Sequence, residues 1–194
     1  MSKFTDVMCD VETTGTNFDR NAIIQISAVK FNYETEEVSE DFFDHCLHIH
    51  PGREWDQDCR VNFWGKMPQL LNEIQSRAED PHTVVKGFYD WLLKDWPSQR
   101  PEGLQFWSKP SHFDHCFISN YFQMFGYDMP CHFRYARDLN SFMAGMRGVT
   151  GAPEFQAGEP EFVGDQHNAL HDVLHQIRLL FAMKKETLQG TVMA

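Results

Sequence analysis

Short apolar runs come first along this chain, and longer amphipathic stretches follow them. Residues 3–9, 23–31 and 42–49 are rich in β-branched and aromatic residues and are bounded by turn-forming residues, which indicates three β-strands. Residues 68–77 and 83–94 show helical patterns, and each has a proline at or just before its start, where a helix needs no backbone N–H. The first half therefore predicts three strands and then two helices.

The second half of the chain alternates between the two kinds of pattern. Strands are predicted at 104–108 and 132–135, and helices at 111–125, 137–146 and 167–185. The last helix carries apolar residues at helical spacing along one side. This order of elements favours an α/β fold in which helices cover both faces of a mixed sheet.

The chain of 194 residues has no internal repeat and no linker composition, so we expect a single domain over residues 1–194. Residues 147–165 are rich in Gly, Pro and Glu and form a predicted mobile loop, and 186–194 form an expected tail. No leader pattern is visible and no apolar run approaches the roughly 18 residues of a membrane span, so we expect a soluble protein without membrane association. Five cysteines without a CxxC pair fit the reducing cytoplasm.

The formal net charge of -11 argues against binding nucleic acid through a broad basic surface. It leaves room for an enzyme that holds a few nucleotides through metal ions. Two acids support that interpretation, because Asp10 and Glu12 directly follow the first predicted strand and precede the turn residue Gly15. Side chains two residues apart on a strand point to the same face, so both carboxylates can bind one cation. Taken alone, the pair is a weak signal, because most such acids are simply solvated loop residues.

Two further acids and a histidine lie far along the chain. Asp114 falls inside the predicted helix at 111–125, where it could also be a simple helix cap. His167 and Asp172 open the last predicted helix, five residues apart, so the histidine stands at the helix entrance and the aspartate about one turn further on. This spacing lets both side chains face one cleft.

Several carboxylates in one cleft repel one another unless cations lie between them, and oxygen ligands favour magnesium or manganese over zinc. We therefore expect two Mg²⁺ or Mn²⁺ ions, an arrangement that suits phosphodiester cleavage. Imidazole titrates near neutral pH, which makes His167 the expected general base.

Histidines offer a rival metal site. His167, His171 and His175 recur at every fourth residue and could bind zinc from one helix face, but no HExxH pattern accompanies them. A second cluster on the third strand could do the same, although an exposed sheet edge is the simpler interpretation: His45, Cys46, His48 and His50.

Together these segments resemble the DEDDh group of 3′ to 5′ exonucleases, the DnaQ-like branch of the ribonuclease H-like superfamily. Residues 10–15, Asp-Val-Glu-Thr-Thr-Gly, are similar to its DxExTG motif, residues 113–114 to its second motif, and residues 167–172 to its HxAxxD motif. The chain is most similar to the compact stand-alone exonucleases of the RNase AS and phage DexA type. It departs from them at 108–112, where Ser-Lys-Pro-Ser-His replaces a small, glycine-containing segment.

The resemblance implies a ribonuclease H-like fold, with a five-stranded mixed sheet whose second strand is antiparallel to the rest. It implies hydrolysis of the last phosphodiester bond at the 3′ end of single-stranded RNA or DNA, releasing nucleoside 5′-monophosphates. The implied metal ligands, with His167 as general base, are Asp10, Glu12, Asp114 and Asp172.

The resemblance also implies that Thr13, Thr14 and Gly15 line the pocket for the terminal nucleotide, although these residues could simply form the turn after the first strand. Phe63 and Trp64 fall where aromatic faces would stack on bases, which contributes roughly 1–3 kcal/mol per base. Both could instead pack in the core, and the two interpretations stay open.

Two other functions remain compatible with the chain. One is a nucleic-acid-binding module that kept the fold and lost the chemistry, which the intact set of acids and histidine disfavours. The other is a proofreading subunit that works with a polymerase. Exposed aromatic residues would also permit a homodimer. No residue can be assigned to the 2′-hydroxyl, so the sequence does not decide between RNA and DNA.

Overall fold

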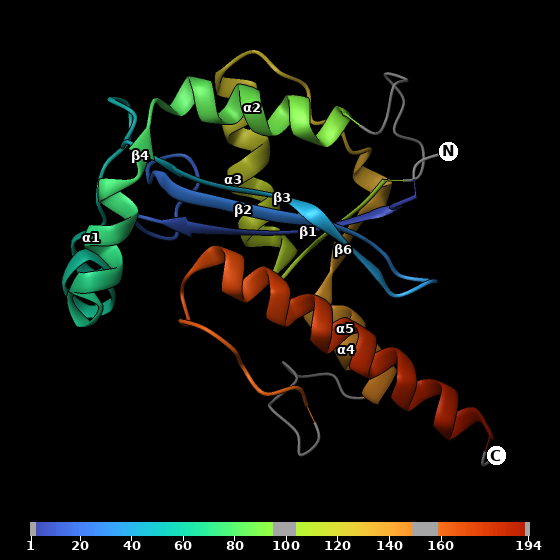
Figure 1. Cartoon of the computed structure of the whole chain (residues 1–194). Coiled ribbons are helices and arrows are strands. Elements are labelled where there is room, and N and C mark those ends of the chain that lie inside the picture. Colours follow the sequence, from blue (N-terminus) through green and yellow to red (C-terminus); the bar gives the residue numbers. More distant parts are fainter. Residues whose placement is uncertain (1–2, 95–103, 149–158, 193–194) are drawn as a thin grey trace.

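The centre of the molecule is a six-stranded mixed sheet (Figure 1). The structure is a computed structural model that describes residues 3–94, 104–148 and 159–192. In chain order its strands are β1 (Asp6–Thr13), β2 (Ile23–Asn32), β3 (Glu37–Leu47), β4 (Ala78–Glu79), β5 (Gln105–Ser108) and β6 (Ala136–Asp138). They lie side by side in the order β4-β3-β2-β1-β5-β6.

Strand β2 runs antiparallel to all the others. It pairs antiparallel with β1 and β3, whereas β1 pairs parallel with β5, β5 with β6, and β3 with β4. Short turns connect β1 to β2 and β2 to β3, which forces antiparallel pairing, while helices separate the later strands along the chain and allow parallel pairing. The predicted mixed sheet with an antiparallel second strand is confirmed, and β4 adds a sixth strand too short to show a sequence pattern.

Helices cover both faces of the sheet. One side carries α2 (Pro81–Leu93) and α3 (Ser111–Met124), and the other carries α4 (Leu139–Arg147) and α5 (Ala169–Val192) (Figure 1). Helix α1 (Pro68–Ser76) lies near the β4 end of the sheet.

Alternation along β1 divides its side chains between two cores. Val7, Cys9 and Val11 pack in the core that contains Phe88 of α2 and Phe117 of α3. Met8 packs instead with residues of α4 and α5. Because every second residue of a strand shares a face, Asp10 and Glu12 lie on the α5 side of the sheet. Full burial of each large apolar side chain contributes about 1.5–3 kcal/mol to folding stability. The apolar residues of the two cores therefore offset the cost of burying these acids.

Several predicted boundaries are wrong, and β1 differs most. It continues through Thr13 instead of ending at residue 9, so Asp10 and Glu12 lie inside the strand. Pairing with β2 as far as Glu12 and Gln25 keeps this polar segment extended, which outweighs the weak strand preference of acids. The predicted strand at 132–135 is also wrong, since residues 133–135 form a 3₁₀ turn and β6 follows it.

The last helix begins at Ala169, so His167 lies in the preceding loop and not in the helix. It runs on to Val192, so most of the segment 186–194 is helical and not the expected separate tail. Of the predicted mobile loop at 147–165, residues 149–158 lie outside the described residues. No helix in the described part of the chain is both long and apolar enough to cross a membrane.

Candidate active site

Acids from β1 and α5 meet on the α5 side of the sheet, near the C-terminal end of β1. Asp10 and Glu12 project from β1 and are only 9% and 7% exposed. Asp172 approaches them from the first turn of α5. One carboxylate oxygen from each of these three residues lies within 4.8 Å of the other two. Such a cluster of oxygen atoms is compact enough to surround one cation.

A fourth acid, Asp114, reaches the same cavity from the first turn of α3. Its side chain is 2% exposed. One oxygen, Oδ1, accepts a hydrogen bond from the backbone N–H of Val11 at 3.2 Å. The other, Oδ2, is buried and has no hydrogen-bond partner among the described residues. An unpartnered buried carboxylate oxygen is costly, so Asp114 fits a role as ligand to a cation.

Burial opposes ionisation of all four acids, and repulsion by neighbouring acids adds to it at Asp10, Glu12 and Asp114. Burial raises the pKa of Asp10 well above its usual value, and the charges of Asp114 and Asp172 raise it further. Burial, followed by the charges of the neighbouring acids, likewise raises the pKa of Glu12. Burial raises the pKa of Asp114 to about 7 and also raises the pKa of Asp172. A bound divalent cation would relieve this repulsion, and the oxygen-only donor set suits magnesium or manganese.

His167 lies at the rim of the same cavity, in the loop before α5. Its backbone adopts the left-handed region with φ of 65°, and its side chain is exposed. The backbone N–H donates to Oδ2 of Asp172 at 2.9 Å. The imidazole meets the ring of Phe63 edge to face, with centroids 4.8 Å apart. The loop is thus fixed by Asp172 while the ring nitrogens of His167 stay accessible.

A second histidine holds this loop from the helix side. His171 accepts a hydrogen bond at Nδ1 from the backbone N–H of Asp165, at 2.9 Å. Gly164 lies against the ring of His171, where a Cβ would come within 2.6 Å of two ring atoms. His171 therefore holds the loop before α5 through this hydrogen bond, and it does not join His167 and His175 in a zinc site. Among the described residues, the group able to hold a metal is Asp10, Glu12 and Asp172.

The acids open into a cavity of about 830 Å³ that is large enough for a nucleotide. It brings together eight of the ten residues predicted for the site: Asp10, Glu12, Thr13, Gly15, Phe63, Asp114, His167 and Asp172. Thr14 and Trp64 are the two that it leaves out.

Thr14 and Trp64 make contacts within the protein, and their predicted substrate contacts stay predictions. The Thr14 hydroxyl donates to the Glu54 carbonyl at 2.7 Å and accepts from the Ala22 N–H at 2.7 Å. Trp64 is fully buried, and its indole N–H donates to the Thr13 carbonyl at 2.9 Å. Both side chains therefore take part in the hydrogen bonding of the fold.

Of the remaining predicted pocket residues, Thr13 and Gly15 shape the turn after β1 and Phe63 lies apart from it. The Thr13 hydroxyl donates to the Gly15 carbonyl at 2.7 Å. A Cβ on Gly15 would come within 2.5 Å of Asn21 Oδ1 and 2.6 Å of the Asp56 Cβ, so only glycine fits there. Phe63 is half-buried and lines the cavity.

Sequence reasoning missed several residues of the cavity, among them Gln176 and Lys109. Gln176 is buried, and its amide donates to Asp10 Oδ1 at 2.8 Å, which orients that carboxylate. Its position one helical turn after Asp172 is the signal that could have revealed it. Lys109 precedes α3 in the segment where the chain departs from the family pattern.

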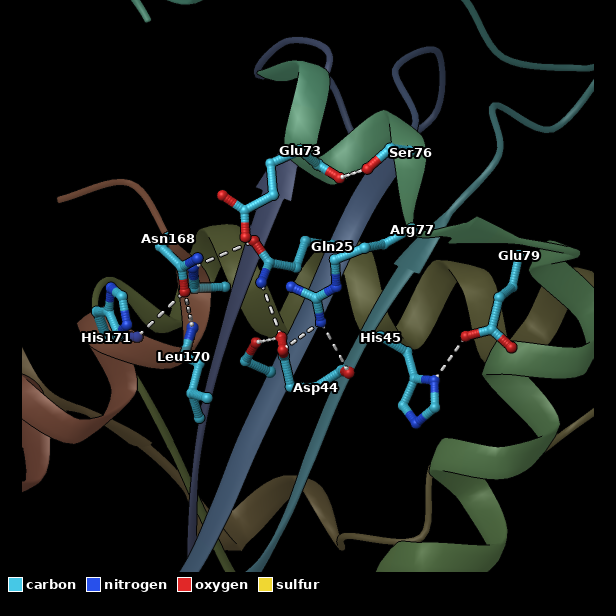
Figure 2. Close-up of polar contacts among 12 residues, drawn as sticks. Gln25, Asp44, His45, Glu73, Ser76, Arg77, Glu79, Asn168, Leu170 and His171 are labelled. Atoms are coloured by element: carbon cyan, nitrogen blue, oxygen red, sulfur yellow. Dashed lines mark hydrogen bonds and ion pairs between the residues drawn. The ribbon is translucent and has the colours of Figure 1, made fainter. Parts of the chain in front are cut away.

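A polar network that runs from the buried Gln25 to the exposed Arg77 fixes the start of α5 from the sheet (Figure 2). Gln25 of β2 is fully buried; its Oε1 accepts from the Ala169 N–H at 3.3 Å and its Nε2 donates to Asp44 Oδ1 at 2.7 Å. Arg77 donates to the other oxygen of Asp44 at 2.5 Å. Burial opposes ionisation of Asp44, but hydrogen bonds from Ser27, Arg77 and Gln25 outweigh it and lower the pKa. The network ties α5 to β2 and β3.

Figure 2 also shows the histidine of the third strand that was a candidate zinc ligand. His45 Nδ1 lies 2.7 Å from Oε1 of Glu79 on β4, and both side chains are about half exposed. This pair joins two neighbouring strands at the sheet edge, and the described residues form no metal cluster there.

The family model described as "3'-5' exoribonuclease Rv2179c-like domain" matches residues 5–183 of the chain. No curated protein sequence matches the chain significantly. Among solved structures, cell-death related nuclease 4 (CRN-4) superposes with a TM-score of 0.70 at 20% identity. E. coli Exonuclease I, solved with a dA16 oligonucleotide and in a zinc-bound complex with single-stranded DNA, superposes with a TM-score of 0.66 at 17% identity.

These superpositions cover nearly all of this chain but only part of the other proteins. CRN-4 is matched over 93% of this chain and 64% of its own length. Exonuclease I is matched over 95% of this chain and 42% of its own length. At such low identity the likeness demonstrates a common ribonuclease H-like fold, and the predicted fold class is confirmed.

Proposed function

The chain belongs to the family of the Rv2179c-like 3'-5' exoribonuclease domain, and from this premise we propose that it hydrolyses the last phosphodiester bond at the 3′ end of single-stranded nucleic acid. The products would be nucleoside 5′-monophosphates, and the family description favours RNA over DNA as the substrate. The observation that carries the proposal is the convergence of four acids and His167 on one cavity.

Asp10, Glu12, Asp114 and Asp172 would hold the metal, which we propose to be two Mg²⁺ or Mn²⁺ ions. Their oxygen-only donors, the unpartnered Oδ2 of Asp114 and the raised pKa values all support a divalent cation here. When bound, such ions activate water and stabilise negative charge on a phosphoryl group. Gln176 keeps Asp10 in the orientation that ligation requires by donating to Oδ1.

His167 acts as the general base in this proposal. Its exposed imidazole lies at the cavity rim and can accept the proton of the attacking water, then release it to solvent. The hydrogen bond from its backbone to Asp172 keeps the base next to the metal ligands. Asp172 therefore links the position of the base to that of the metal site.

The turn after β1 and the ring of Phe63 form the surface for the terminal nucleoside. Thr13 and Gly15 bring backbone groups to the cavity wall, and Gly15 leaves no side chain in the way. Phe63 lines the cavity beside His167 and can contact a base or sugar through its free face.

The test is incubation of the protein with 5′-labelled single-stranded RNA and DNA, with magnesium, with manganese and with chelator. We expect metal-dependent shortening from the 3′ end, faster on RNA, that Asp10→Asn and His167→Ala each reduce by at least about a hundredfold. Asp90→Asn, on the exposed side of α2, is the matched control and should behave like wild type. No shortening of either substrate with any metal would contradict the proposal and favour a binding module.

Three finer expectations stay predictions. The homodimer, the cytoplasmic location and a partnership with a polymerase each require a measurement of their own, and light scattering of the purified chain would decide the first.

A further inference from the structure

The active-site cavity contains a single lysine or arginine among the residues that the structure describes, and it is Lys109. This residue lies between Ser108, where β5 ends, and Pro110, which caps α3. Its side chain is half-buried. A cation in this position is unusual, because the cavity wall is otherwise strongly acidic.

Six carboxylates line the same cavity: Asp10, Glu12, Asp56, Asp58, Asp114 and Asp172. A nucleic-acid backbone carries one negative charge per nucleotide, so this wall would repel the substrate. Metal ions would neutralise part of the charge, but Lys109 is the cation that the described chain itself supplies here.

The ammonium group of Lys109 lies close to the metal-binding acids. It lowers the pKa of Asp10 and of Asp172, in each case against the larger effect of burial, and it adds to the effect of burial in lowering the pKa of His175. These three residues come from β1 and α5, at the part of the cavity where the phosphodiester bond would be cut. Together with its place in the cavity wall, this puts Lys109 among the residues that surround the metal-binding acids.

Despite this proximity, the Lys109 ammonium makes no hydrogen bond and no ion pair with any residue in the described ranges. Lys30, a lysine buried in the core, shows the contrast, because it donates to the Trp91 carbonyl at 2.7 Å. Lys109 is only half-buried, so water can satisfy its ammonium where no protein group does. The free ammonium of Lys109 is available to a ligand.

The backbone around Lys109 is held firmly in place. The Ser111 N–H donates to Asp138 Oδ2 at 2.6 Å, and the Phe113 N–H donates to the Pro110 carbonyl at 3.0 Å. Asp114 follows within the first turn of the same helix. Lys109 and Asp114 are thus carried by one anchored segment, which fixes the base of the lysine relative to the metal site.

We propose that Lys109 is a phosphate-binding residue of this site, whose ammonium contacts the backbone phosphate at, or directly next to, the bond that is cut. The proposal rests on the proposed function and extends it with a substrate contact. The ammonium compensates the acidic wall at the point where the polyanion enters.

The first test measures binding of a 5′-fluorescent single-stranded oligonucleotide of RNA to wild type, Lys109→Met, Lys109→Arg and Lys86→Met. Binding is followed by anisotropy with calcium or chelator in place of magnesium, between about 50 and 200 mM salt, and gels of the same samples verify that the oligonucleotide stays intact. Lys86 is exposed on α2 and pairs with Asp90, so Lys86→Met is the matched control.

We expect Lys109→Met to weaken binding about tenfold at low salt and to make the logarithmic salt dependence less steep by about 0.7, the value for one lost contact to a single strand. Lys109→Arg should retain most of the affinity, and Lys86→Met should match wild type. Equal affinity and equal salt dependence for Lys109→Met and wild type would overturn the proposal, as would a wild-type protein that does not bind the oligonucleotide.

A metal titration separates this contact from a purely structural role. Removing a positive charge beside the acids should tighten divalent-metal binding, so weaker oligonucleotide binding by Lys109→Met would not come from a lost metal. Lys109→Gln replaces Lys109→Met if the latter does not fold. Hydrolysis of the same oligonucleotide by wild type in magnesium is assayed separately. Its absence would refute the proposed function, while the binding comparison would still decide the role of Lys109.

Discussion

The backbone N–H of His167 donates a hydrogen bond to Oδ2 of Asp172 at 2.9 Å. Asp172 is also one of the three acids whose oxygens lie within 4.8 Å of one another. One carboxylate therefore supports both the loop that carries the proposed base and the cluster that would hold the metal. Substitutions at this position can separate the two effects.

Asp172→Asn should keep the hydrogen bond that holds the His167 loop but weaken metal binding, because an amide oxygen still accepts the N–H but is a weak metal ligand. Asp172→Ala should lose both the hydrogen bond and metal binding. A hydrogen bond to a charged group contributes roughly 1.5–3 kcal/mol, so amide exchange at residues 164–168 should accelerate about tenfold or more in Asp172→Ala. Hydrogen exchange measured by mass spectrometry checks this. Equal exchange in the two variants would refute the link between Asp172 and the loop.

The Asp114 carboxyl should make the metal-free protein less stable as the pH rises. Burial raises the pKa of Asp114 from 3.8 to about 7, so its contribution to stability is fully present below about pH 4 and is lost as the pH rises to about 7. Asp114→Asn cannot ionise and still accepts from the Val11 N–H. In chelator, this variant should therefore melt higher than wild type at pH 8, and the difference should vanish toward pH 4.

Thermal melts of both proteins across this pH range provide the measurement. The difference between the two melting temperatures reports the Asp114 carboxyl together with its effect on the pKa of Asp10 and of Glu12. A difference that does not change with pH would contradict the burial account of this acid. Saturating magnesium should reverse the order at pH 8, because only the wild-type site binds the metal fully.

Gly15→Ala should disrupt the turn that follows β1. The added Cβ would lie 2.5 Å from Asn21 Oδ1 and 2.6 Å from the Asp56 Cβ, and such overpacking costs typically 1–3 kcal/mol. Unfolding in urea measures the loss of free energy of unfolding, and the exonuclease activity should fall together with it. Gly145→Ala in α4 is the matched control, because a Cβ there meets nothing within 4 Å and should stabilise the helix by about 0.4–1 kcal/mol. Equal stability of Gly15→Ala and wild type would show that the turn adapts.

Gln25→Met should weaken the attachment of α5 to the sheet. The change leaves the Ala169 N–H without its acceptor and removes a donor from Asp44, at a cost of roughly 1–3 kcal/mol. Gln75→Met, on the exposed side of α1, controls for the substitution itself. The free energy of unfolding, measured in urea, and the affinity for magnesium should both fall in Gln25→Met and not in Gln75→Met. Wild-type values of both quantities in Gln25→Met would exclude a positioning role for Gln25.

Local patterns in the sequence predicted the features that depend on neighbouring residues. Alternation along the first strand placed Asp10 and Glu12 on one face, whereas the antiparallel direction of β2 was implied by the family resemblance. Distant partners set the rest. The end of β1 depends on pairing with β2, Gln25 meets Ala169 across 144 positions, and Trp64 is buried by contacts that no local pattern encodes. Lys109 looked like a departure from a motif, and its place in the cavity emerged only from the fold.

In the proposed reaction, water attacks the last phosphodiester bond at a 3′ end in this acid-lined cavity. Hydrolysis of a short RNA in oxygen-18-labelled water with magnesium, followed by mass spectrometry of the products, traces that oxygen atom. We expect nucleoside 5′-monophosphates that carry one oxygen-18 atom, released stepwise by wild type and not by Asp10→Asn. Intact RNA, internal fragments or products with a 3′-phosphate would contradict this reaction.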